Sequence, residues 1–151
     1  DSLVDWSVFY SGVNNPERAG RMVGVLAEGS EGHAIWPELD VAEEDLIVLK
    51  DRYSAFLPGA SDLAEILEVK GIDTVVITGT LTNVCSESSA RDAMMLNFKT
   101  FIISDANAAP TDEEHIASLA ALFQVFSDVY ATDELIEMVE KHQQSGTVAA
   151  E

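Results

Sequence analysis

The 151-residue sequence has a single cysteine, Cys85, and only eight lysine and arginine residues against 27 aspartate and glutamate residues. One cysteine cannot form an internal disulfide, which is typical of a reducing compartment and leaves a free thiol to explain. The formal charge of −19 repels phosphate backbones and anionic lipid, so we expect neither nucleic acid nor a membrane surface as partner. Net acidity of this size also keeps a protein soluble in concentrated salt, which leaves a salt-adapted source open.

Long apolar runs and a secretion signal are also missing. No run approaches the ~18 apolar residues of a membrane span, and the start of the chain lacks the basic and apolar regions of a signal peptide. We therefore expect a cytoplasmic protein. The length and a hydrophobic content of 47%, which is ordinary for a packed core, predict one domain. Residues 1–143 are assigned to that domain and residues 144–151 to a loose tail.

Apolar runs suited to strands alternate with segments of helical spacing along the chain. The expected strands are 46–50, 74–79, 100–104 and 125–130. The run at 74–79 is rich in β-branched residues and does not alternate, which suits a strand buried on both faces of a parallel sheet. This order predicts right-handed crossovers and an α/β fold with a doubly wound, mostly parallel sheet flanked by helices.

Helix boundaries have local signals. Asn15 followed by proline predicts a helix start, and Gly71 supplies the left-handed stop of a helix that begins near residue 61. Thr111 and Glu114 form the pattern of a capping box, and Thr132 is an expected N-cap of the last helix. A further helix is expected over residues 83–96.

Three chemically useful side chains fall at the carboxyl ends of expected strands. Lys50 ends the first strand, Cys85 lies in the first helical turn after the second, and Asp105 follows the third. Ligands of open parallel sheets bind at that edge, because the loops there surround a crevice and the following helices direct their N-termini into it. Asp105 is expected to be a structural residue of a turn. Tyr53 and Phe56 follow Lys50 and are expected in the wall of a substrate pocket or in the core.

Cys85 is a candidate nucleophile by position. Unpaired N–H groups and the helix dipole at a helix start favour a thiolate and can hold the oxyanion of a tetrahedral intermediate. On the residues alone, the alternative is a small buried hydrophobic side chain, the commoner role of a lone cysteine. His33, His115 and His142 are scattered without metal-ligand spacing, so we expect no metal and no cofactor.

The segment GTLTNVCSESSARDAMMLNF, residues 79–98, resembles the nucleophile segment of the isochorismatase-like cysteine hydrolases. Also similar are LKDRYSAF at 49–56, SDANAA at 104–109 and GHAIWPELDV at 32–41. Together these motifs cover nearly all of the chain from about Asp5 to Leu135. Within that superfamily the sequence is most similar to the amidohydrolases of the streptothricin-hydrolase-like branch.

The resemblance implies a role for each matching residue. Cys85 would be the nucleophile and Lys50 the cation that stabilises charge near it. A cis peptide bond would join Thr80 and Leu81, which turns the Leu81 N–H towards the oxyanion beside the N–H of Cys85. The resemblance also implies a homo-oligomer, either a dimer or a tetramer.

The catalytic aspartate of the family has no good match. It ends the first family strand, whereas the spacing places the start of this chain after the second, and Asp5 resembles it only superficially. We therefore expect residues 1–143 to be the carboxy-terminal portion of one cysteine hydrolase domain, whose sheet is incomplete in this chain. The two absent strands would separate the strand at 46–50 from the strand at 74–79. Without a base for the thiol proton, the chain alone is expected to be inactive.

The function expected from these residues is cofactor-free hydrolysis of a small-molecule amide, carbamoyl or lactam C–N bond through a covalent acyl-enzyme on Cys85. One alternative is an isochorismatase-type hydrolase of another small molecule, although the vinyl-ether hydrolases of the family do not rely on the cysteine. The reactive thiol also suits a non-catalytic binding or redox-sensing module. The incomplete sheet suits an interaction-only subunit that completes the sheet of a neighbour.

Overall fold

The computed structural model describes residues 6–9 and 15–148, so Asp5 lies outside the described residues. The chain divides into two compact units, Asp1–Ile47 and Val48–Glu151. The first unit contains the helix α1 (Pro16–Val25), which begins at the predicted Asn15-Pro16 start. Proline fits this position because the first helical N–H has no intrahelical partner to lose.

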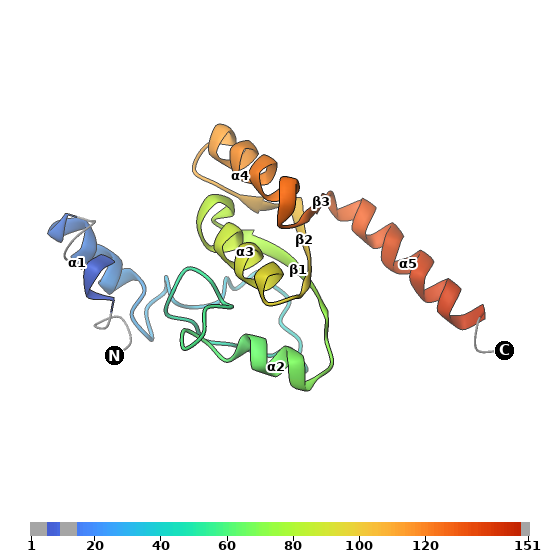
Figure 1. Ribbon diagram of the computed structural model, residues 1–151. Helices are drawn as coiled ribbons and strands as arrows, with labels where there is room; N and C mark the ends of the chain where they lie inside the picture. The colour runs from blue at the N-terminus through green and yellow to red at the C-terminus, as the bar shows by residue number, and fades with distance from the viewer. Residues whose placement is uncertain (1–5, 10–14, 149–151) are drawn as a thin grey trace. The chain divides into compact units, whose positions relative to one another are not determined.

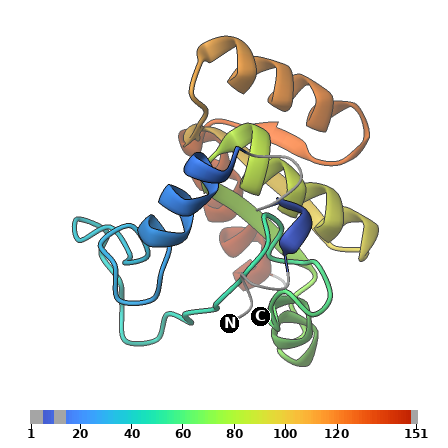
Figure 2. The ribbon, with the colours of Figure 1, turned by 90° about the vertical axis from the view of Figure 1, so that its left-hand side faces the viewer.

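The second unit is built on a parallel sheet. In the described residues its strands follow the order β1 (Thr74–Thr80), β2 (Lys99–Ala108) and β3 (Asp128–Tyr130). The helices that follow these strands are α3 (Glu87–Met95), α4 (Asp112–Val125) and α5 (Thr132–Val148). Helices α3 and α4 lie on one side of the sheet and α5 on the other (Figure 1, Figure 2). The predicted α/β class, with a parallel sheet flanked by helices, is confirmed.

Helix α3 lies over the middle of the core. Ala90 has no exposed surface and packs with Ile102 of β2 and Leu122 of α4. Ala93, one turn further along α3, packs with Phe98 in a second cluster that includes residues of the helix α2 (Leu63–Val69). Alanine at both positions lets the helix approach the sheet closely, because each presents only a methyl group.

Two strand predictions are corrected by the structure. Residues 46–50 form no strand, and Leu46, Ile47 and Leu49 are exposed. β1 is not buried on both faces, since Val76 is 44% exposed. The physical reason is shared: within the described residues β1 has a strand neighbour only on the β2 side, and residues 46–50 have none.

The predicted helix boundaries are confirmed in part. The capping box is confirmed at its central bond, because the Glu114 N–H donates to Thr111 Oγ1 at 3.2 Å. Gly71, with a φ of +68°, ends α2 in the left-handed conformation as expected. The N-cap assigned to Thr132 is wrong, because this residue already belongs to α5. Its N–H and its hydroxyl both donate to Asp105 of β2. α5 continues to Val148, past residue 144 where the tail was expected to begin.

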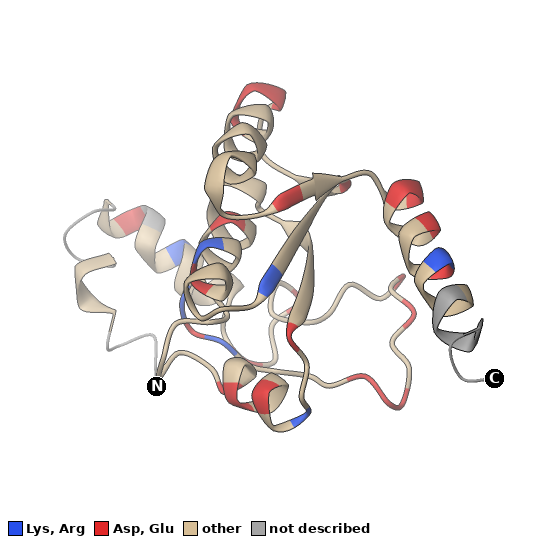
Figure 3. Ribbon diagram, turned by 45° about the vertical axis from the view of Figure 1, so that its right-hand side comes forward, with Lys and Arg blue, Asp and Glu red and all other residues tan. Residues whose placement is uncertain are grey.

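Acidic side chains are spread over α2, α4 and α5 (Figure 3). They gather in first helical turns, with three in α4 and two in α5, while the last turns of these helices carry no basic residue. Carboxylates at a helix start interact favourably with the helix dipole. Among the described helices, none combines the length and the apolarity that crossing a membrane requires.

Leu122 and Phe123 are neighbours on α4 and test this packing as a matched pair, because they are 0% and 65% exposed. We expect Leu122→Ala to lower the free energy of unfolding by about 2–5 kcal/mol through the cavity it leaves. Phe123→Ala should change it by less than about 0.5 kcal/mol. Urea denaturation followed by circular dichroism measures both, and equal losses would contradict the packing of α4.

Candidate active site

β1 passes into α3 through a single turn of π-helix, η3 (Thr82–Ser86), called the π-turn below. The N–H groups of Val84 and Ser86 both donate to the Leu81 carbonyl, each at 3.1 Å. Cys85 lies between these two donors as a half-buried free thiol. Single π-helical turns occur frequently at functional sites, because the wider turn changes how side chains are presented. The sequence-predicted nucleophile therefore stands in the first helical turn beyond the carboxyl end of β1.

The end of β1 is shaped by an irregularity just before the π-turn. The register between β1 and β2 shifts between Ile77 and Gly79, and Gly79 has a φ of +111°, a conformation that favours glycine. The Asn107 amide bridges the strands there by donating to the Ile77 carbonyl at 3.0 Å. The peptide bond between Thr80 and Leu81 is cis, at the position that the sequence resemblance implies.

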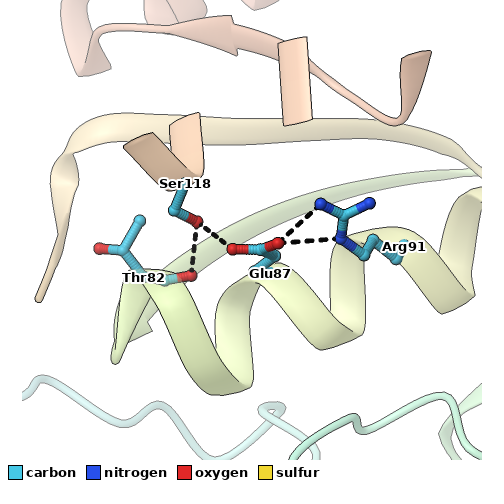
Figure 4. A network of polar contacts seen from close by, with 4 residues as sticks. All are labelled: Thr82, Glu87, Arg91 and Ser118. Atoms are coloured by element: carbon cyan, nitrogen blue, oxygen red, sulfur yellow. Dashed lines mark hydrogen bonds and ion pairs between the residues drawn. The ribbon is translucent and has the colours of Figure 1, made fainter. Parts of the chain in front are cut away.

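The π-turn is joined to α4 by a chain of polar contacts (Figure 4). Ser118 Oγ lies 2.6 Å from Glu87 Oε2 and 3.2 Å from the Thr82 carbonyl oxygen. Glu87 Oε1 accepts two hydrogen bonds from the Arg91 guanidinium, at 3.0 and 2.7 Å. That guanidinium also lies 4.1 Å from the ring centroid of Phe126. None of these contacts was predicted from the sequence.

His115 belongs to the same region but not to a cluster of metal ligands. Its Nδ1 lies 2.9 Å from Thr82 Oγ1, so α4 also contacts the π-turn through an imidazole. Within the described part of the chain, no group of three or more His, Cys, Asp or Glu side chains is arranged to hold a metal ion.

Lys50 is exposed, and its ammonium donates to the carbonyls of its own loop. The distances are 2.9 Å to the Arg52 oxygen and 3.2 Å to the Tyr53 oxygen. In the described structure no hydrogen bond joins the Lys50 ammonium to the Cys85 thiol. The structure thus places the expected cation at the start of a loop, with its charge directed to that loop.

The loop after Lys50 packs on α3. The Ala55 N–H donates to Ser89 Oγ at 3.1 Å, one helical turn beyond Cys85. Phe56 is buried, and its ring centroid lies 5.5 Å from that of Phe98. Its ring is thus part of the core, whereas Tyr53 is half-buried. Of the two aromatic residues considered for a pocket wall, the structure gives Phe56 a packing role.

Asp105 has a structural role, as the sequence suggested. Its Oδ1 accepts hydrogen bonds from the Thr132 hydroxyl at 2.8 Å and from the Thr132 N–H at 2.9 Å, which fixes the start of α5 to β2. The hydrogen bond from the Thr132 hydroxyl holds the pKa of Asp105 below its usual value, and the bond from the Thr132 N–H contributes less to the same shift. This carboxylate is therefore committed to the start of α5.

Comparison with known proteins gives one consistent family. The family model of the isochorismatase domain matches residues 3–134. The chain is 37% identical over 119 residues to an uncharacterized isochorismatase family protein of Bacillus subtilis, covering 75% of this chain and 62% of that protein. It is 32% identical over 136 residues to a ureidoacrylate amidohydrolase of Acinetobacter baylyi, covering 89% and 53%.

Solved structures agree with the sequence comparisons. The fold matches a cysteine hydrolase from Pseudomonas syringae pv. phaseolicola with a TM-score of 0.75 and 29% identity, covering 87% of this chain and 67% of that one. The chain thus spans between 53% and 67% of the length of these three proteins.

The bond from Thr132 to Asp105 predicts how stability depends on pH. A carboxylate with a lowered folded pKa stabilises the protein fully above its unfolded pKa of about 3.9, and this contribution is lost as the pH falls through the folded value. We expect Asp105→Asn to lower the melting temperature at neutral pH and to approach the wild type below about pH 4. Thermal unfolding across this range measures the difference, and a gap that stayed constant with pH would contradict the assignment.

Proposed function

Because this chain belongs to the isochorismatase family, we propose that the protein is a cofactor-free hydrolase that cleaves a small-molecule amide, carbamoyl or lactam C–N bond with Cys85 as nucleophile. The observation that carries the proposal is the place of the thiol. Cys85 is half-buried in the π-turn at the carboxyl end of a parallel strand, where ligands of open α/β sheets bind. Two of the three proteins compared above, the amidohydrolase and the cysteine hydrolase, support this reaction class.

The proposed reaction has two steps. The thiolate attacks the carbonyl carbon, a C–S bond forms, and the C–N bond breaks as the leaving nitrogen takes a proton. Water then attacks the thioester and releases the acid. The N–H groups of Leu81 and Cys85 are proposed to donate to the oxyanion in both steps, which is the largest single contribution in many acyl-transfer enzymes.

Lys50 is proposed to supply positive charge near the sulfur. Its loop is bound to α3 through Ala55 and Ser89, one turn from Cys85, which supports this placement. The ammonium would exchange its bonds to the loop carbonyls for the thiolate by rotation about the four rotatable bonds of its side chain. Lys50 would then stabilise the charged nucleophile and the first intermediate.

The proton carrier is proposed to come from a segment outside this sequence, which also pairs with β1. Three observations support this. Among the described residues β1 has a strand neighbour on the β2 side only, the apolar residues 46–49 are largely exposed, and the relatives are longer than this chain. A bare strand edge invites association, so an added strand would both bring the aspartate and cover the edge.

This proposal predicts different activities for a longer and a shorter protein. A protein that extends this chain at its amino end by a strand, a helix and a strand should hydrolyse small amides, because an added aspartate then takes the thiol proton. The 151-residue chain alone should not. Native mass spectrometry of both would also test the expected dimer or tetramer. Full activity of the shorter chain would show that no added base is needed.

The role of Cys85 predicts a loss of turnover without a loss of fold. In the active protein, Cys85→Ala should lower kcat/KM on a panel of primary amides, ureido compounds and lactams by about a thousandfold or more. Met95→Ala, an exposed change at the end of α3, the helix that follows the π-turn, is the matched control and should leave turnover within about twofold. Melting temperatures confirm that both variants are folded. Retained hydrolysis in Cys85→Ala would end the proposal.

A redox-sensing module is the second candidate, because the half-buried free thiol of Cys85 also suits reversible oxidation. Iodoacetamide separates the two functions. Rapid alkylation of Cys85 without hydrolysis of any compound in the panel would favour the sensor. Hydrolysis that alkylation abolishes would favour the enzyme.

A further inference from the structure

The hydroxyl of Ser118 links the helix α4 to the turn that carries Cys85. It lies 2.6 Å from a Glu87 oxygen and 3.2 Å from the Thr82 carbonyl, with its oxygen between these two groups (Figure 4). A hydroxyl has one proton, so the two acceptors share it, with the shorter bond to the charged carboxylate. Thr82 is the first residue of the π-turn, and its carbonyl also accepts from the Glu87 N–H. The hydroxyl therefore fixes both ends of that turn.

Burial makes this link rigid. Thr82 is completely buried and Ser118 is 4% exposed, so water has little access to either partner. Both carboxylate oxygens of Glu87 are engaged, one by Ser118 and the other by Arg91. The guanidinium compensates the negative charge of Glu87, which stands two residues from the sulfur. An uncompensated carboxylate at that distance would oppose a thiolate.

We propose that Ser118 and Glu87 are positioning residues for the nucleophile. They hold the Thr82 carbonyl, and with it the π-turn, so that the Cys85 thiol and the neighbouring N–H groups keep one orientation. This inference rests on the proposed function for its effect on turnover, but its effect on thiol reactivity does not need a substrate. Misplacement of a reacting group by about 1 Å can cost a hundredfold in rate, so a single buried hydrogen bond is sufficient to matter.

The chain offers a matched control in Ser127. This serine is also buried, at 8% exposure, and its hydroxyl donates to the Thr100 and Asp128 carbonyls at 3.0 and 2.9 Å. Those carbonyls lie near the starts of β2 and β3, at the edge of the sheet opposite to the π-turn. Removing either hydroxyl costs a buried hydrogen bond to a backbone carbonyl, and of the two serines only Ser118 is connected to the residues around Cys85.

The test compares Ser118→Ala with Ser127→Ala in the active protein. We expect Ser118→Ala to lower kcat about tenfold with KM within about twofold, and to slow the alkylation of Cys85 by iodoacetamide about threefold. Ser127→Ala should change kcat, KM and alkylation by less than about twofold. Both variants should lower the melting temperature by similar amounts. Equal kcat and equal alkylation rates in the two variants would overturn the proposal.

Glu87→Gln provides a second variant of similar shape if Ser118→Ala does not fold. Glutamine has one acceptor oxygen, so it cannot serve Ser118 and Arg91 with separate oxygens, and we expect slower alkylation and a lower kcat than wild type. Unchanged values for a folded Glu87→Gln would also overturn the proposal. If the proposed function is wrong, hydrolysis persists in Cys85→Ala, whereas the alkylation rates still test the positioning role. The two failures are therefore distinguishable.

Discussion

The position of Cys85 depends on how closely α3 packs on the sheet. Ala90 and Ala93 have no exposed surface, and each contributes one methyl group to a separate core cluster. The helix axis therefore lies near β1 and β2, and the chain has only the π-turn in which to change from strand to helix. A larger side chain at either alanine would move the helix away from the sheet and would displace the thiol with it.

Much of this arrangement could be predicted from local signals. β1 and β2 each contain a short apolar run, at residues 75–77 and 101–103. Thr111 and Glu114 mark the start of α4 within four residues, and Gly71 ends α2 through its own backbone preference. The place of Cys85 in a first helical turn followed from the same kind of local signal. Each of these features is decided by residues close together in the chain, which is why a single sequence was sufficient.

The features that could not be predicted depend on distant partners. Residues 46–50 have the composition of a strand but pair with no strand in the described part of the chain, and Thr132 bonds to Asp105, which is 27 positions away. Glu87 and Arg91 stand four apart on a helix, a spacing that favours an ion pair. Nothing local identifies Ser118 as the partner of Glu87, since this contact depends on how α4 packs beside α3.

The acidic helix starts have a consequence for the ionic atmosphere of the protein. A formal charge of −19 is tolerated when counterions screen it within about 8 Å, as they do near 0.15 M salt. In ~0.01 M salt the screening length grows to about 30 Å, and carboxylates on separate helices then repel one another across the whole second unit. We therefore expect dilution of salt to weaken this fold through repulsion between carboxylates, and dissolved cations to stabilise it by screening that repulsion.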